Sequence, residues 1–250
     1  MAEQSVRAWR LVLDHIEGDL LEGRLNPGDR LPSERDLAVD LGVGRSSVRE
    51  AFRVLEVMGL IRTATGSGPQ AGAIVIATPT GGMSQLLRLQ VAAHGFPLAD
   101  VVQTRLVLED AVVHALTTSA DRDTAEAHRM LEAMDAPDLS PAEFLALDAQ
   151  FHLALAEASD NSVIAAMMAG LRSSIESYVQ AGAVAIPDWS AMADRLRKEH
   201  RALVARVDAG DELAARALLR AHITGYYTAA GLTRRQPSDP PIPTPDPTEN

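Results

Sequence analysis

The sequence lacks cysteine altogether and is poor in aromatic residues, which make up 4% of its 250 residues. Without cysteine there are no disulfide bonds and no thiolate metal ligands, as is usual in a reducing cytoplasm. The low aromatic content favours packed helices over a β-sandwich, because strands are enriched in aromatic and β-branched side chains. No apolar run approaches the roughly 18 residues that suggest a membrane span, and the first residues show no apolar core of an export signal. We therefore expect a cytoplasmic protein without a membrane partner.

Basic residues are fewer than acidic ones, 23 against 34, and the net charge is −11. Such an excess of acid disfavours DNA binding if it is spread evenly along the chain. Residues 1–77, however, contain nine arginines and eleven acidic residues, whereas residues 78–250 contain 14 basic and 23 acidic residues. Most of the excess acid therefore lies in the C-terminal part, and a local arginine-rich face in the N-terminal part can still contact phosphates.

Residues 31–60 predict two short helices joined by a glycine-containing turn. Ser33 is a candidate N-cap of the first helix, and Gly42-Val43-Gly44 breaks the helical periodicity after it. The second helix starts at Arg45 or Ser46, and its predicted buried residues are Val48, Ala51, Phe52, Leu55 and Val57. This pattern is typical of a helix-turn-helix, whose second helix enters the DNA major groove. The spacing alone leaves an ordinary helical hairpin equally open.

The stretch LPSERDLAVDLGVGRSSVREAFRVLEVMGLI closely resembles the winged-helix DNA-binding domain of the GntR family of bacterial transcription regulators. The resemblance implies that the second helix contacts the operator. Arg45 and Arg49 are then placed to reach base edges, and Arg35, Ser46 and Ser47 to hold phosphates. The predicted DNA-binding residues are Ser33, Arg35, Arg45, Ser46, Ser47 and Arg49.

Composition and periodicity divide the chain into four parts. These are a winged helix-turn-helix domain, a linker, an all-helical domain and a disordered proline-rich tail, at residues 1–77, 78–82, 83–231 and 232–250. The first domain is predicted to begin with a helix over 3–24 and to end with a wing of strands 60–64 and 73–77. The predicted helices of the second domain cover 83–94, 98–119, 122–135, 141–158, 161–182, 189–209 and 211–230. The predicted fold is thus mainly α, a winged helix-turn-helix followed by an all-α helical bundle.

Four polar residues of the predicted bundle suit a metal site. Asp148 and His152 lie four positions apart, so one helix face carries both, and His200 and His222 lie in two later helices. A helical bundle can bring such residues to one point, and one carboxylate with three neutral imidazoles suits a divalent cation such as Zn²⁺, Ni²⁺ or Mn²⁺. Taken alone the spacing is weak evidence, because a histidine on a helix is more often an ordinary side chain.

The residues after the linker resemble the all-helical ligand-sensing (FCD) domain of the FadR-type branch of the GntR family. The matching stretches are QTRLVLEDAVVHAL, LDAQFHLALAEASDN and EHRALVARVDAGDELAARALLRAHI. Many members of that branch bind a divalent metal through one aspartate and three histidines. The resemblance places Asp148, His152, His200 and His222 at those positions.

A small carboxylate that binds the metal directly is the effector that this resemblance implies. Arg105 is a candidate second anchor, since guanidinium pairs bidentately with carboxylate, although an intrahelical pair with Glu109 is an equal alternative. Asn161 is a further candidate for effector binding, with capping of the following helix as its alternative.

We therefore expect a homodimeric transcription regulator, with repression as the expected sign, that binds a pseudo-palindromic operator in double-stranded DNA. Effector binding in the helical domain would change operator affinity through different affinities for two arrangements of the DNA-binding domains. One alternative is a metal-dependent enzyme that uses the Asp and His side chains, which leaves the helix-turn-helix without a role. Another is a regulator that senses the metal itself.

Overall fold

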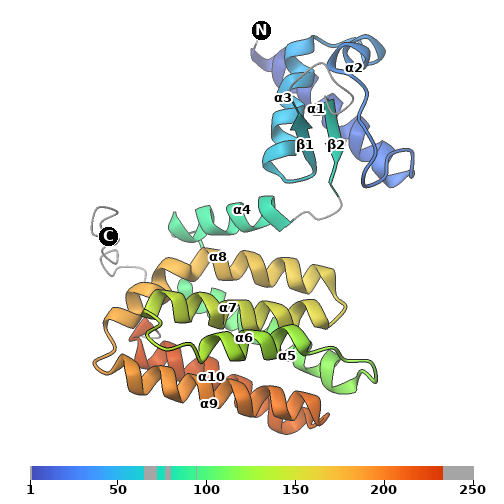
Figure 1. Ribbon diagram of the computed structural model, residues 1–250. Helices are drawn as coiled ribbons and strands as arrows, with labels where there is room; N and C mark the ends of the chain where they lie inside the picture. The colour runs from blue at the N-terminus through green and yellow to red at the C-terminus, as the bar shows by residue number, and fades with distance from the viewer. Residues whose placement is uncertain (1, 65–71, 77–79, 94, 233–250) are drawn as a thin grey trace. The chain divides into compact units, whose positions relative to one another are not determined.

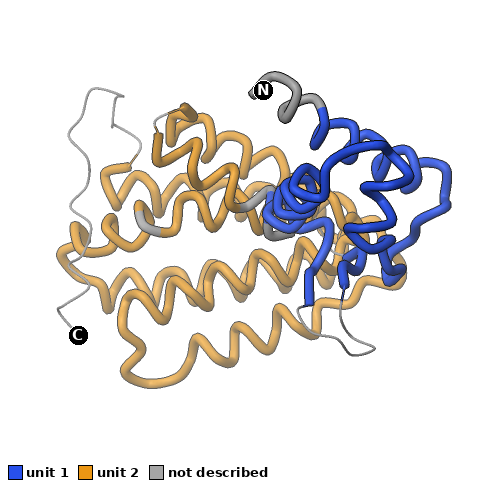
Figure 2. The backbone as a smooth tube through the Cα atoms, turned by 90° about the horizontal axis from the view of Figure 1, so that it is seen from above, with its two compact units in different colours: residues 1–83 blue, residues 84–250 orange. Residues whose placement is uncertain are grey.

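The structure is a computed structural model that describes residues 2–64, 72–76, 80–93 and 95–232. Backbone contacts divide the chain into two compact units, residues 1–83 and 84–250, coloured blue and orange in Figure 2. Each unit contains its own cluster of buried apolar side chains, and the two are described separately. None of the described helices is long and apolar enough to cross a lipid bilayer.

In the first unit, helices and a short hairpin surround one core (Figure 1). The elements are α1 (Ala2–Leu21), α2 (Glu34–Asp40), α3 (Arg45–Val57), β1 (Ile61–Ala64) and β2 (Gly72–Val75). α1 packs on α3, and its buried Ile16 joins Leu37 of α2 and Phe52 of α3. α1 ends three residues before the predicted helix 3–24 does, because Gly23 adopts a φ of +73°, a left-handed conformation that commonly ends helices.

α2, α3 and the turn between them form the predicted helix-turn-helix. The Ser33 side chain accepts a hydrogen bond from the Asp36 N–H and caps α2, and Gly42 in the turn has a φ of +62°, which favours glycine. The buried residues of α3 are Val48, Ala51, Phe52 and Leu55. The prediction that Val57 is buried is wrong, since this residue is 64% exposed. Val57 follows Phe52 by five residues, which places its side chain about 140° around the helix axis from that of Phe52.

The wing is an antiparallel pair in which Ile61 lies opposite Val75. Both of these side chains are buried, so the hairpin covers the core that α1 and α3 share. The second strand begins at Gly72 and ends at Val75, slightly ahead of the predicted range 73–77. Residues 65–71, which connect the strands, lie outside the described residues.

The described part of the second unit contains helices and no strands, which confirms the predicted all-α bundle. The division between the units, after residue 83, falls within α4. The helices are α4 (Thr80–Ala92), α5 (Leu98–Thr118), α6 (Ala125–Met134), α7 (Pro141–Ala158), α8 (Ser162–Val184), α9 (Trp189–Asp208) and α10 (Glu212–Ala229). α7 packs against α6 and α8, and α10 packs against α5 and α9. Phe144, Phe151 and Tyr227 are among the largest fully buried side chains and fill the space between these helices.

The boundaries of the second unit differ from the predicted ones at both ends. α4 begins at Thr80, so residues 80–82 of the predicted linker are helical. Glycine lowers helix propensity by about 1 kcal/mol, but the two glycines here lie in the first turn and good helix formers follow them. Leu232, predicted to begin the disordered tail, is 5% exposed and belongs to the core. The rest of the predicted tail, residues 233–250, lies outside the described residues.

Candidate metal centre and nucleic-acid interface

Three helices of the second unit bring the four predicted metal ligands together. α7 carries Asp148 and His152 one turn apart, α9 carries His200, and α10 carries His222. One ligand atom from each of the four lies within 4.8 Å of the other three. The histidine side chains are nearly inaccessible to solvent, and the Asp148 side chain is 13% exposed. The sequence pattern therefore corresponds to one compact group of donors.

The separations of these donors fit a shared metal ion. The Nε2 atom of His222 lies 3.2 Å from Nε2 of His152 and 3.1 Å from Nε2 of His200. The Asp148 Oδ1 atom is 3.0 Å from His200 Nε2 and 3.8 Å from His222 Nε2. An ion about 2.1 Å from two nitrogens separates them by about 3.0 Å at a right angle and about 3.4 Å at a tetrahedral angle. The observed nitrogen spacings lie between these values.

Two glutamates behind the cluster explain why two of the three histidines, His152 and His222, can present lone pairs to its centre. His222 Nδ1 lies in hydrogen-bond contact with Glu199 Oε2 at 2.9 Å, and His152 Nδ1 lies 2.6 Å from Glu109 Oε2, in a less well-aligned contact. Each carboxylate favours a proton on Nδ1 and leaves the Nε2 lone pair free. Lone pairs that face one another at such short distances repel unless a cation lies between them. The donor set therefore fits a divalent metal.

Electrostatic surroundings keep two of the ligand candidates, His200 and Asp148, in the protonation states that metal binding requires. Burial and the nearby His222 lower the pKa of His200 to about 4, against the opposing effect of Asp148, so this imidazole is neutral at pH 7. Burial alone would raise the pKa of Asp148, but the hydrogen bond to His200 and the neighbouring histidines hold that pKa well below its usual range. The carboxylate is therefore ionised at neutral pH.

Arg105 lies beside the cluster and is already engaged by protein groups. Its Nε is 2.5 Å from Glu109 Oε1, and its Nη1 donates to Tyr227 Oη at 3.3 Å. Burial would raise the pKa of Glu109, but Arg105 and His152 together lower it to about 2. The intrahelical pair with Glu109 is thus formed. Arg105 fixes the carboxylate that contacts the metal-ligand candidate His152.

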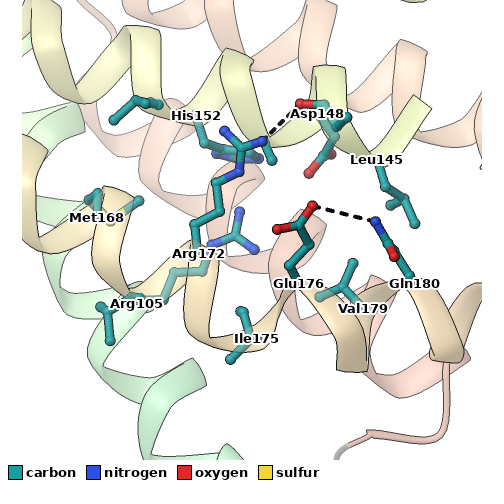
Figure 3. A pocket seen from close by; sticks show the side chains of 14 residues that line it. Arg105, Leu145, Asp148, His152, Met168, Arg172, Ile175, Glu176, Val179 and Gln180 are labelled. Carbon is teal, nitrogen blue, oxygen red and sulfur yellow. Dashed lines mark hydrogen bonds between the residues drawn. The ribbon is translucent and has the colours of Figure 1, made fainter. Parts of the chain in front are cut away.

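A cavity adjoins the cluster between α5, α7 and α8 (Figure 3). The empty space between these helices, with the open mouth included, is about 600 Å³. Asp148 and His152 of α7 lie along one side, and Arg105 of α5 and Arg172 and Glu176 of α8 also line the cavity. Most of the remaining wall is aliphatic. Its members include Leu145, Leu153, Met168, Leu171, Ile175 and Val179.

Asn161, the other predicted effector residue, is not among the residues that line this cavity. Its side-chain oxygen accepts a hydrogen bond of 3.1 Å from the Ile164 N–H and caps α8. The structure therefore shows the capping alternative for Asn161. Its binding of an effector stays a prediction that the position of the cavity does not favour.

The predicted DNA-binding residues lie together at the start of α2 and α3. Arg35, Arg45 and Ser46 are exposed, and Ser47 is partly exposed. Ser33, which caps α2, also donates its hydroxyl to Asp36 Oδ2 at 2.6 Å.

Arg49 is exposed as well, but it has a carboxylate partner. It binds Glu34 through Nε to Oε1 at 3.2 Å and Nη2 to Oε2 at 2.8 Å. The hydrogen bond from Arg49 also lowers the pKa of Glu34. Arg49 must therefore leave Glu34 before its guanidinium can pair bidentately with a base.

Comparison with known proteins identifies the two units. The family model "Bacterial regulatory proteins, gntR family" matches residues 10–69, and the model "FCD domain" matches residues 100–225. The chain belongs to the GntR family and carries an FCD domain. It is therefore a DNA-binding transcription regulator of the GntR/FCD type, and the metalloenzyme alternative is not supported.

Individual relatives of this GntR regulator agree with the assignment. A regulatory protein provisionally assigned to the L-lactate dehydrogenase operon of Escherichia coli is 30% identical over 224 residues, covering 87% of this chain and 84% of the relative. The transcriptional repressor NanR of Cronobacter sakazakii is 27% identical over 227 residues, covering 87% and 83%. The solved structure of Streptococcus agalactiae GntR, 23% identical, superposes with a TM-score of 0.63 over 92% of this chain and 100% of that one, which shows a shared fold.

Sequence reasoning on this GntR/FCD chain missed the groups that support the cluster. The sequence offers Glu109 only as a partner of Arg105 and carries no spacing signal for Glu199. A signal for Arg172 was present, because it and Glu176 are the only charged residues of α8, a helix of 23 residues. Charged side chains on an otherwise apolar helix indicate a polar site in the core.

Proposed function

We propose that this regulator binds its operator as a homodimer and that a small carboxylate effector, bound at a divalent metal in the second unit, controls operator affinity. The observation that carries the proposal is the convergence of Asp148 Oδ1 and three imidazole Nε2 atoms beside an open cavity. Its action on chromosomal DNA would take place in the cytoplasm. Repression is the proposed sign, and the relative NanR is named a repressor.

The four side chains would hold an ion of the Zn²⁺, Ni²⁺ or Mn²⁺ class, which all accept imidazole and carboxylate ligands. When bound, the ion supplies positive charge and open coordination positions for a carboxylate oxygen. Glu109 and Glu199 orient His152 and His222 toward it, and such supporting partners are worth about 10–100-fold in metal affinity. Asp148 belongs to the proposed ion site and also lines the cavity in which the effector would bind.

On the DNA side, we propose that α3 enters the major groove. Arg45 would reach a base edge directly, and Arg49 would do so after leaving Glu34. Arg35, Ser46 and Ser47 would bind phosphates and set the register. Two copies of the chain would read the two halves of a pseudo-palindromic operator, since protein two-fold symmetry is matched by operator symmetry.

The experiment that tests the proposal is an operator titration in four states of the protein. A duplex selected by this protein from random DNA is labelled, and fluorescence anisotropy measures its binding to metal-free and metal-loaded protein, each with and without a carboxylate panel. A change of operator affinity that requires both metal and carboxylate supports the proposal. A change that follows metal alone supports direct metal sensing instead, and no change in any state contradicts effector control by this site.

A further inference from the structure

Arg172 is a charged side chain of the cavity wall that has no carboxylate partner within 4.0 Å among the described residues. It is half-buried on α8, and its Nη2 donates to the backbone carbonyl of Ala146 at 3.1 Å. Figure 3 shows its guanidinium pointing into the cavity toward Asp148 and His152. A buried guanidinium commonly pairs with a carboxylate or phosphate. Arg172 therefore offers a charge that has no ion pair within the described part of the chain.

Arg105, the other arginine of the cavity, is differently placed. Its guanidinium is committed to Glu109 and Tyr227, and Glu109 in turn contacts His152. A ligand carboxylate at Arg105 would have to compete with a carboxylate that is 4% exposed and fixed from two sides. Arg105 thus acts through Glu109 as a positioning residue, and the cavity needs another group to hold an anion.

Burial and the neighbouring charges act on Arg172 in opposite directions. Burial lowers the pKa of Arg172, Glu176 and Asp148 raise it, and Arg105 lowers it, with a net lowering. The positive charge is therefore only partly compensated in its present surroundings. Glu176 is exposed and accepts a long hydrogen bond of 3.5 Å from Gln180 at the edge of the cavity. An incoming carboxylate would complete the solvation that Arg172 lacks.

The rest of the cavity is suited to hydrocarbon. Met168, Ile175 and Val179 of α8 face Leu145 and Leu153 of α7 across it. Apart from Arg172 and the cluster, the lining groups that could bond hydroxyls on a ligand are Glu176 and Gln180 at the edge of the cavity. A hydroxyl buried against the aliphatic side chains without a partner costs about 1–3 kcal/mol. A second ligand carboxylate would meet the aliphatic wall as well. The aliphatic wall therefore disfavours both polyhydroxylated acids and dicarboxylates.

We propose that Arg172 anchors the effector carboxylate and that the opposite wall selects an aliphatic tail, so that the effector is an aliphatic monocarboxylate rather than a sugar acid or a dicarboxylate. This inference rests on the proposed function of the same site, and it adds a specificity-determining residue and a ligand class. The carboxylate lies between Arg172 and the edge of the metal cluster at Asp148, and the tail extends along Met168, Ile175 and Val179.

The test measures carboxylate binding to metal-loaded, full-length protein by isothermal titration calorimetry. Acetate, butanoate and hexanoate vary the tail, and gluconate and adipate keep six carbons but add hydroxyls or a second carboxylate. Affinity should rise about fourfold for each methylene that the wall covers. Hexanoate should bind at least about tenfold more tightly than gluconate or adipate, because the wall leaves their extra polar groups without partners.

Single substitutions test whether Arg172 binds the carboxylate and whether the aliphatic wall binds the tail. Arg172→Gln should weaken every carboxylate by at least about tenfold, since it removes a charged hydrogen-bond partner, while metal content and the gain per methylene stay as in the wild type. Arg206→Gln, which changes an exposed arginine of α9, is the matched control and should change nothing. Val179→Thr, nearly isosteric, should weaken hexanoate by about threefold and leave acetate unchanged. This second variant tests the wall even if Arg172→Gln fails to fold.

The outcomes separate this inference from the proposed function. If metal-loaded wild-type protein binds none of the carboxylates, the proposed function fails and the inference fails with it. If the wild type binds them and folded, metal-loaded Arg172→Gln binds them equally well, the anchor is wrong while effector control stands. If gluconate or adipate equals hexanoate, or if Val179→Thr leaves the tail preference unchanged, the aliphatic selection is overturned.

Discussion

Exchanging Glu109 for glutamine isolates the buried charge that links Arg105 to the candidate metal ligands. Glu109 is 4% exposed and contacts both Arg105 and His152. Glutamine keeps the size of the side chain but leaves the Arg105 guanidinium, 15% exposed, without its negative partner. Breaking a buried ion pair in this way costs about 3–5 kcal/mol. At about 2–4 °C for each kcal/mol in a domain of this size, the melting temperature of metal-free protein should fall by roughly 10 °C.

Two assays separate the effects of this substitution. Scanning calorimetry of chelator-treated protein reports the lost ion pair, and competition with a chelator of known affinity reports metal binding. Metal affinity should fall about 10–100-fold, because His152 loses the carboxylate that orients it. Glu126→Gln is the control, since Glu126 is exposed and pairs with Arg129 on the surface of α6. A melting temperature within about 2 °C of the wild type, together with unchanged metal affinity, would refute the reasoning.

Three further predictions concern the DNA-binding unit and the end of the bundle. Glu34→Gln frees Arg49 from an exposed ion pair, so operator affinity at fixed salt should rise about twofold to fivefold in fluorescence anisotropy. Val48→Ala, at a fully buried position of α3, should lower the free energy of unfolding of the first unit by about 2 kcal/mol in urea denaturation, whereas Val57→Ala on the exposed side should change it by less than about 0.5 kcal/mol. Leu232→Ala should destabilise the second unit by about 2–3 kcal/mol in calorimetry, because Leu232 is buried beyond the end of α10.

Each of these predictions has a contrary result. Unchanged or weaker operator binding by Glu34→Gln would mean that the Glu34–Arg49 pair does not restrain base contact. Equal losses for Val48→Ala and Val57→Ala would contradict the assigned buried face of α3. Leu213→Ala, at an 84% exposed position of α10, is the control for Leu232→Ala, and equal effects of the two would place residue 232 outside the core.

The helices could be predicted because the signals for them are local. Ser140 at the start of α7 forms a capping box with Glu143, and Pro141 follows in the first turn, so the sequence marks the helix start directly. The predicted range 141–158 is the observed one. Leu232 is different, because its burial depends on packing against distant residues such as Gly182. No pattern of its neighbours reveals that contact.

The residues of the candidate site also divide into those that a local pattern predicts and those that only tertiary packing brings together. Asp148 and His152 share a helix face by their spacing, but the approach of His200 and His222 depends on how α9 and α10 pack against α7. The residue types make His200 and His222 candidates, but the family resemblance, rather than the periodicity, favours them as ligands. The Glu34–Arg49 pair crosses the turn between α2 and α3, and Arg172 enters the cavity from a helix without any other predicted site residue. Contacts of this kind are set by tertiary packing and carry no spacing rule.

The most direct test of the central claim measures operator affinity of metal-loaded protein with and without hexanoate, for the wild type and for His200→Ala. The wild type should show a change of at least about tenfold on adding hexanoate, a coupling of about 1.4 kcal/mol between the two sites, and chelation should abolish it. His200→Ala, which removes a candidate metal ligand from α9 in the second unit, should bind the operator without responding to hexanoate. Equal operator affinity of metal-loaded wild type with and without the carboxylates would contradict the account.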